Sequence, residues 1–278
     1  MIQAWLDLPL PLMFATVAGF YGSTALFLFW LCFGRWTRRW MLTFNGAVAE
    51  LFGAIMVIFG ILIGFVAGDV WDGWRQAVST VESEAASLAM LSELASASGL
   101  PTDDIRRDIR VYVAAVTEKE WPSMGDTGRG APEARQALGT LLKDVASLQH
   151  DPKDPSARFD NLMLDMALKV QGARAARLAL SAPSSEDVKW ACVLLLALMG
   201  QISIAMLHLD KPRPHIAAMT ILTTSIVLII VLIAASEGPF QPPIYVRSDP
   251  ISRVLTLLPE EGVPLPPPAD ASASGKGI

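Results

Sequence analysis

The sequence is poor in the residues that most often carry chemistry in soluble enzymes. It contains two cysteines and three histidines, and only 18% of its 278 residues are charged. Cys32 and Cys192 both fall inside long apolar runs, where a thiol serves as a small packing residue, so they indicate nothing about the redox compartment. His150, His208 and His215 are not spaced as metal ligands with other donors. The sequence therefore predicts no metal site and no cofactor.

Common enzyme motifs are also absent, and the net charge does not favour binding to nucleic acid. There is no glycine loop between a strand and a helix and no serine-nucleophile elbow. Glu82 and Glu84, like Glu118 and Glu120, lie two residues apart and point to different helix faces. We interpret them as solvated charges or as partners of nearby arginines (Arg106, Arg107 and Arg110) rather than as an acid/base pair. The net charge of −5 argues against a nucleic-acid partner, because phosphate binding needs clustered Lys and Arg.

Long apolar runs are abundant instead. Each is close to the roughly 20 residues that cross a ~30 Å hydrocarbon core as a helix. The sequence therefore predicts an all-α fold, in which four transmembrane helices carry an extramembrane helical bundle inserted between the second and third spans. The four runs are 11–33, 47–68, 188–206 and 216–236.

The chain divides further by composition. No proline occurs between Pro11 and Pro101, so we expect the second helix to continue past the membrane. The middle of the chain is expected to be helical over 105–119, 133–149 and 157–180, with a Gly- and Pro-containing loop over 121–132. Residues 247–258 either dock on this bundle or lie at the membrane surface. The predicted divisions are an N-terminal segment 1–10, spans 11–70, a helical domain 71–187, spans 188–237, a docked segment 238–262 and a disordered tail 263–278.

Orientation follows from the short loops between spans. The first carries Arg35, Arg38 and Arg39, and the last carries Lys211 and Arg213. The positive-inside rule places both loops in the cytoplasm. The helical domain and both termini are then extracytoplasmic, and the expected location is a bacterial inner membrane.

The second span carries the clearest pattern. Gly60, Gly64 and Gly68 are spaced four apart and share one helix face, with Gly53 and Glu50 on or near it. Small residues at this spacing let two helices pack closely in lipid. The same face could instead line a path for ions through an oligomer, because absent side chains leave room. Both interpretations stay open.

Polar residues flank this face at both ends. In a symmetric oligomer Asp72 would form a ring of carboxylates, which attracts cations; alternatively it is an interfacial acid paired with Arg75. Glu50 is either a functional acid within a span or a side chain that reaches water. The candidate pore-lining residues are Glu50, Gly53, Gly60, Gly64, Gly68, Asp72 and Gln76. Six polar side chains in the last two spans are interpreted as forming interhelical hydrogen bonds, with a polar pore wall as the alternative. They are Gln201, Ser203, Thr220, Thr223, Thr224 and Ser225.

Several short motifs follow one another in a recognisable order. They are Gly64-Phe65-Val66-Ala67, Val70-Trp71, Glu120-Trp121-Pro122, Arg174 with Arg177-Leu178, and Glu237-Gly238-Pro239-Phe240. Over about residues 45–258 this pattern resembles the membrane proteins that carry a bestrophin-like domain. The resemblance implies four spans with a helical domain between the second and third. It also implies kinship with bestrophins, pentameric ion channels whose second span lines the pore.

Two function classes remain. The first is a homo-oligomeric membrane ion channel whose second transmembrane helix lines the pore and whose partners are the bilayer, copies of the chain and inorganic ions. The family name suggests anions, but the acidic residues Asp69 and Asp72 at the mouth favour cations slightly. The alternative is a non-conducting sensor or scaffold whose acidic helical domain binds a partner or a divalent cation. Few spans and no inverted repeat argue against a secondary transporter.

Overall fold

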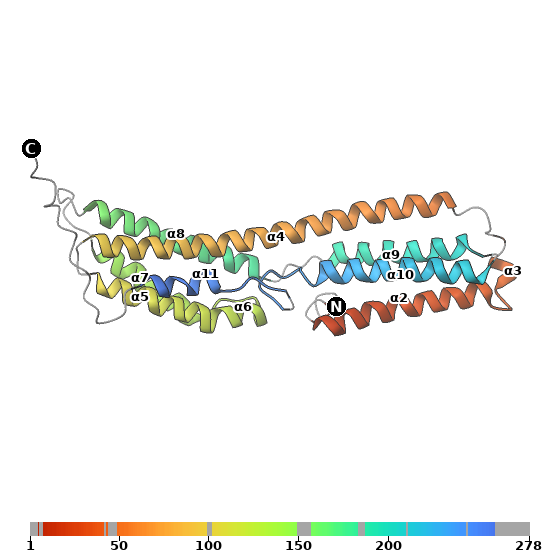
Figure 1. Ribbon diagram of the computed structural model, residues 1–278, viewed down its shortest axis with the longest axis horizontal. Coiled ribbons are helices and arrows are strands. Elements are labelled where there is room, and N and C mark those ends of the chain that lie inside the picture. The colour runs from red at the N-terminus through yellow and green to blue at the C-terminus, as the bar shows by residue number, and fades with distance from the viewer. Residues whose placement is uncertain are drawn as a thin grey trace, which may run out of the picture. The chain divides into compact units, whose positions relative to one another are not determined.

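The computed structural model describes residues 5, 8–41, 43, 49–98, 102–148, 157–182, 187–209, 211–242 and 244–258. Within these ranges every regular element is a helix (Figure 1). Among the described residues, four helices are long and apolar enough to cross a membrane. They are α2 (Leu10–Phe33), α4 (Ala49–Ala97), α9 (Asp187–Leu207) and α10 (Pro212–Ala234). The predicted all-α class and the four apolar helices are confirmed, and α4 continues far beyond its apolar run as expected.

The remaining helices are shorter or less apolar, and the chain forms two compact units. These helices are α3 (Arg38–Met41), α5 (Asp103–Ala115), the π-helix η2 (Val116–Glu120), α6 (Trp121–Thr127), α7 (Pro132–Ser147), α8 (Ala157–Ser181), α11 (Asp249–Ser252) and α12 (Val254–Leu257). The first unit, called here the span unit, comprises Met1–Thr80, Trp121–Arg129 and Ala176–Arg247. The second, the bundle unit, comprises Val81–Glu120, Gly130–Ala175 and Ser248–Ile278. Helices α4 and α8 contribute residues to both.

In the span unit, α2, α9 and α10 contact one another, and one face of α4 joins their core. That face repeats every three to four residues, as a helix with one buried stripe requires. It comprises Phe59, Ile63, Val66, Ala67 and Val70. The close approach of α4 to α9 occurs at Gly200, where a Cβ would lie 2.7 Å from Met56 Sδ.

A buried amide joins three of the spans. Gln201 of α9 is fully buried, and its Oε1 accepts a hydrogen bond from Thr24 of α2 at 2.7 Å. Its Nε2 donates to Thr223 Oγ1 of α10 at 2.7 Å and to the Tyr21 carbonyl at 3.1 Å. The predicted interhelical hydrogen bonding is therefore confirmed for Gln201 and Thr223, but it is wrong for Ser225, whose hydroxyl donates to the Ile221 carbonyl of its own helix. In lipid, a side chain that satisfies its polar atoms across helices stabilises their association.

In the bundle unit, α5 is the central element. It packs against α7 and η2, and the short helices α11 and α12 also contact it. Its buried residues Ile105, Ile109, Tyr112 and Val113 recur at helical spacing and form its inner stripe. Of the two alternatives for residues 247–258, the structure has this segment docked on α5.

The loop expected over 121–132 is wrong in its first half, because Trp121–Thr127 forms α6. Pro122 is the second residue of α6, which continues directly from the π-helix η2, so it stands inside an unbroken helical stretch from Asp103 to Thr127. The helix ends at Gly128, whose φ of 66° is left-handed and whose N–H donates to the Met124 carbonyl at 3.0 Å. Gly128 therefore ends the helix, whereas Pro122 lies inside it.

Some predictions fall on residues that the structure does not describe. The tail 263–278 and most of the N-terminal segment 1–10 lie outside the described residues, as does the side chain of Glu50. The predicted domain boundaries remain predictions.

Replacement of Gln201 by Leu is expected to lower the free energy of unfolding by about 1–3 kcal/mol, because each interhelical hydrogen bond in a membrane contributes on the order of 1 kcal/mol. Ser225→Ala is the matched control, since the Ser225 hydroxyl bonds only to the Ile221 carbonyl of its own helix. Denaturant titration of the purified protein in detergent measures both. Equal losses in the two variants would contradict the role assigned to Gln201.

Candidate functional site

The predicted pore-lining glycines share one exposed face of α4. Gly53, Gly60 and Gly64 are exposed and Gly68 is half-buried. A Cβ built at any of the four would meet no atom of the described chain within 4 Å. The face lies beside the stripe that packs into the span-unit core, and the side of α4 opposite that stripe carries Ile61 and Phe65. Within the described part of the chain, no other helix packs closely on the glycines.

The polar end of this face carries an ion pair. The carboxylate of Asp72 binds the guanidinium of Arg75, three residues later on α4. Both side chains are largely exposed, so the pair contributes little to stability. Gln76 and Asp69 are exposed on the same helix. The pairing of Asp72 with Arg75, one of the two alternatives, is confirmed within one chain.

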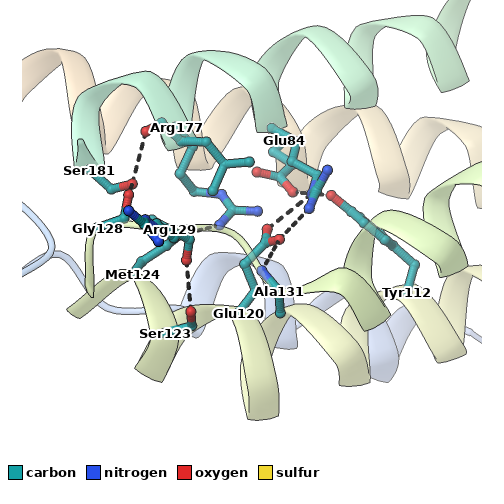
Figure 2. A network of polar contacts seen from close by, with 12 residues as sticks. Glu84, Tyr112, Glu120, Ser123, Met124, Gly128, Arg129, Ala131, Arg177 and Ser181 are labelled. Carbon is teal, nitrogen blue, oxygen red and sulfur yellow. Dashed lines mark hydrogen bonds and ion pairs between the residues drawn. The ribbon is translucent and has the colours of Figure 1, made fainter. Parts of the chain in front are cut away.

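A second polar cluster lies inside the bundle unit, around Glu120 (Figure 2). Glu120 ends the π-helix η2 and is fully buried. One of its carboxylate oxygens accepts a hydrogen bond from Arg174 Nε of α8 at 3.0 Å, and the other binds the Arg174 Nη2. The second oxygen also accepts the backbone N–H of Ala131 at 3.2 Å. This bidentate geometry is the strongest that an arginine and a carboxylate can form.

A further buried carboxylate belongs to the same unit. Glu84 of α4 is fully buried, and it accepts a hydrogen bond of 2.6 Å from the Tyr112 hydroxyl of α5. In Figure 2 the Tyr112 ring extends toward Glu84. The interpretation of Glu84 and Glu120 as solvated charges is wrong. Glu120 pairs with Arg174 of α8.

The span unit contains a separate cluster around Trp121. Arg177 of α8 is fully buried, its guanidinium lies 5.0 Å from the Trp121 ring centroid, and its Nη1 is 2.8 Å from Met124 Sδ. The Trp121 indole donates to the Val246 carbonyl at 3.1 Å and packs edge-on against Phe240. A Cβ at Gly125 would approach the Phe240 carbonyl to 3.4 Å. Residues from three of the recognised motifs therefore meet here.

These buried arginines could not be assigned from local sequence patterns. Arg174 and Arg177 lie three apart on α8, but their partners are 54 and 53 residues away in the chain. The one signal was their membership in the motifs that carry the family resemblance. Both clusters join segments that are far apart in the sequence, which is a structural role.

In the described part of the chain, no group of three or more His, Cys, Asp or Glu side chains is arranged to hold a metal ion. His208 and His215 lie at the α9–α10 end, where His215 packs against the rings of Phe29 and Phe33. His150 is outside the described residues.

Replacement of Glu120 by Leu is expected to cost about 3–5 kcal/mol of stability, because it leaves the Arg174 guanidinium buried without its partner. Adding Arg174→Met to Glu120→Leu should recover part of this loss, since the unpaired charge is then removed. Asp165→Ala is the control: Asp165 pairs with Lys169 at 2.8 Å on the surface of α8, where loss of a pair costs at most about 1 kcal/mol. Thermal unfolding of the three variants tests this, and a Glu120→Leu loss no larger than the control would contradict it.

Two solved structures resemble this fold. One is described as a membrane protein; its TM-score is 0.66 at 12% identity, and the alignment covers 86% of this chain and 98% of that chain. The other is a bacterial bestrophin homologue from Klebsiella pneumoniae with a mutation; its TM-score is 0.60 at 12% identity, covering 76% of this chain and 84% of that chain. At this identity the likeness shows the fold alone.

Family membership comes from the sequence. No curated protein matches the chain. Residues 19–251, however, match the bestrophin-like domain. This range contains all four apolar helices except the start of α2, both buried arginine clusters and the glycine face of α4. Because the match covers most of its length, the chain belongs to the bestrophin-like domain family.

Proposed function

We propose that this protein is the subunit of a homo-oligomeric membrane ion channel in which α4 lines the pore. The observation that carries the proposal is the open glycine face of α4. Its four glycines meet no neighbour within the described chain, although another face of the same helix is packed into a core. The described part of a single chain does not cover this face, and in the proposed oligomer the other subunits would surround it.

The side chains around the glycines fit a pore wall. Val57 and Ile61 lie beside them and are 61% and 57% exposed, so they narrow the face without adding charge. Apolar constrictions of this kind gate ion passage by excluding water. The glycines leave room on either side of them, so an ion can approach the backbone.

The charge beyond this face favours cations slightly. Asp69, Asp72 and Glu82 are exposed on α4 together with one basic residue, Arg75. Three carboxylates against one guanidinium leave a net charge of −2 on this stretch of each subunit. Repeated around a symmetric axis, the charge would raise the local concentration of cations.

The same proposal includes an orientation. Arg35, Arg38, Arg39, Lys211 and Arg213 are all exposed, in or beside the short connections between spans. The positive-inside rule puts these connections in the cytoplasm of a bacterial inner membrane. The acidic end of the α4 apolar face is then extracytoplasmic.

A Gly64→Leu variant is expected to reduce unitary current severalfold, because the new side chain would fill the path. Gly19→Leu is the matched control: Gly19 is also exposed, on α2, and a Cβ there meets nothing within 4 Å. Recordings of the purified variants in planar bilayers measure the current. Wild-type current in Gly64→Leu, or the same reduction in Gly19→Leu, would contradict a pore along α4.

An Asp72→Asn variant is expected to move the reversal potential toward that of chloride, because it lowers the local charge and frees Arg75 from its partner. The shift should shrink at high ionic strength, where charges beyond about 3 Å are screened in 1 M salt. The measurement is the reversal potential under an asymmetric KCl gradient. Asp165→Asn, which breaks a comparable surface pair on α8, should leave the potential unchanged. An unshifted potential in Asp72→Asn would remove Asp72 from the ion path.

Silent bilayers would favour the second function class. A monomeric or dimeric protein that conducts nothing would point to a sensor or scaffold, because a central pore needs several subunits. Size-exclusion chromatography with light scattering, run on the same preparation, separates this outcome from a closed gate.

A further inference from the structure

A buried pair of carboxyl groups lies where α5 packs against α7. Asp108 of α5 is only 5% exposed, and it is flanked on its helix by the core residues Ile105, Ile109 and Tyr112. Its carboxyl group is within hydrogen-bonding range of the carboxyl group of Asp144 on α7. Its Oδ2 has no hydrogen-bond partner among the described residues. Two ionised carboxylates cannot share such a position without strong repulsion, so the arrangement requires a proton.

The surrounding positive charge is too weak to remove this requirement. Arg107 Nη2 lies 3.8 Å from Asp108 Oδ1, which is the edge of ion-pair range. Arg107 is 57% exposed at its side chain and makes a closer contact of 2.7 Å with Asp104. Asp104 in turn adds negative charge near Asp108.

The other elements packed against α5 add no excess of positive charge. Helix α7 brings Asp144 itself, next to Lys143. The π-helix η2 carries two acidic residues and one basic residue, which are Glu118, Glu120 and Lys119. Helix α11 carries the acidic residue Asp249 and is followed by the basic residue Arg253.

We propose that Asp108 and Asp144 form a proton-operated latch, which holds α7 against α5 when the two carboxyl groups share a proton and loosens when both are ionised. The latch belongs to the bundle unit and does not depend on whether the protein conducts. Since α5 also contacts η2, α11 and α12, release of α7 would alter the core around which this unit is built.

The direction of the pH dependence follows from the pKa of Asp108. Burial, followed by the hydrogen bond to Asp144 and the charge of that residue, raises the pKa of Asp108 from 3.8 to about 6. The closed pair therefore binds a proton more tightly than the open pair does. The latch is stabilised at acidic pH, and this contribution is lost as the pH rises through about 6. Between pH 5 and pH 7, the opening equilibrium constant should rise about tenfold.

Hydrogen–deuterium exchange of the full-length protein in nanodiscs tests the latch directly. After correction for the intrinsic pH dependence of exchange, protection of the α7 peptides is expected to fall about tenfold between pH 5 and pH 7. In Asp108→Asn the amide can donate to Asp144 at any pH, so protection should stay at its acidic level across the range. Peptides from α2 and α9 in the same samples report whether the change is local.

Two further variants make the result decisive. Asp144→Asn should also abolish the pH dependence, and it decides the question if Asp108→Asn fails to fold, because Asp144 is only half-buried. Asp165→Asn on α8 should keep the wild-type profile. Protection of α7 that is flat or rises with pH in the wild type would overturn the proposal, as would a wild-type profile in either latch variant.

Discussion

Helix α4 runs for 49 residues, from Ala49 to Ala97, and contributes buried side chains to both units of the chain. Its apolar part places Phe59, Ile63 and Val70 in the span-unit core, and its later part buries Leu88 and Leu91 in the bundle unit. Inside a bilayer every backbone polar group must be satisfied within its own segment, so a long uninterrupted helix is the economical solution. A proline anywhere in this stretch would remove a hydrogen bond on which packing at both ends relies.

Polar interactions select one arrangement of these helices where apolar packing alone would permit several. In the span unit Gln201 can satisfy its amide only when Thr24, Thr223 and Tyr21 are all in place. In the bundle unit Glu120 needs Arg174 and the backbone of Ala131 together. Each arrangement leaves an unpaired buried polar group if one helix shifts by a turn, and such a group costs far more than the interaction gains. We therefore infer that Gln201 and Glu120 determine which arrangement of the helices is stable.

The sequence was sufficient for features that depend on local composition and insufficient for those that depend on distant partners. Hydropathy and length placed all four spans, because transfer into lipid is decided segment by segment. The burial of Glu84 and Glu120 was missed, since spacing along a helix says nothing of an arginine on α8 or a tyrosine on α5. Helix α6 was missed because Pro122, Gly125 and Gly128 are typical loop residues, although the first two lie inside a helical stretch and only Gly128 ends it. The shared face of the α4 glycines could be predicted from their spacing. Its exposure could not, because packed and exposed glycines have the same spacing in the sequence.

The contrast between Gly200 and the α4 glycines bears on what surrounds the chain. Gly200 has a function within one subunit, because it lets α9 approach Met56 of α4. Gly53, Gly60, Gly64 and Gly68 have none, since each faces open space. In a soluble helix each interior glycine costs about 1 kcal/mol relative to alanine, so four of them on one face need a compensating gain. Packing inside the described part of the chain does not supply it, and lipid would be covered equally well by alanine. The proposed channel offers two sources for this gain: contact with another copy of α4, and the space that the glycines leave for ions.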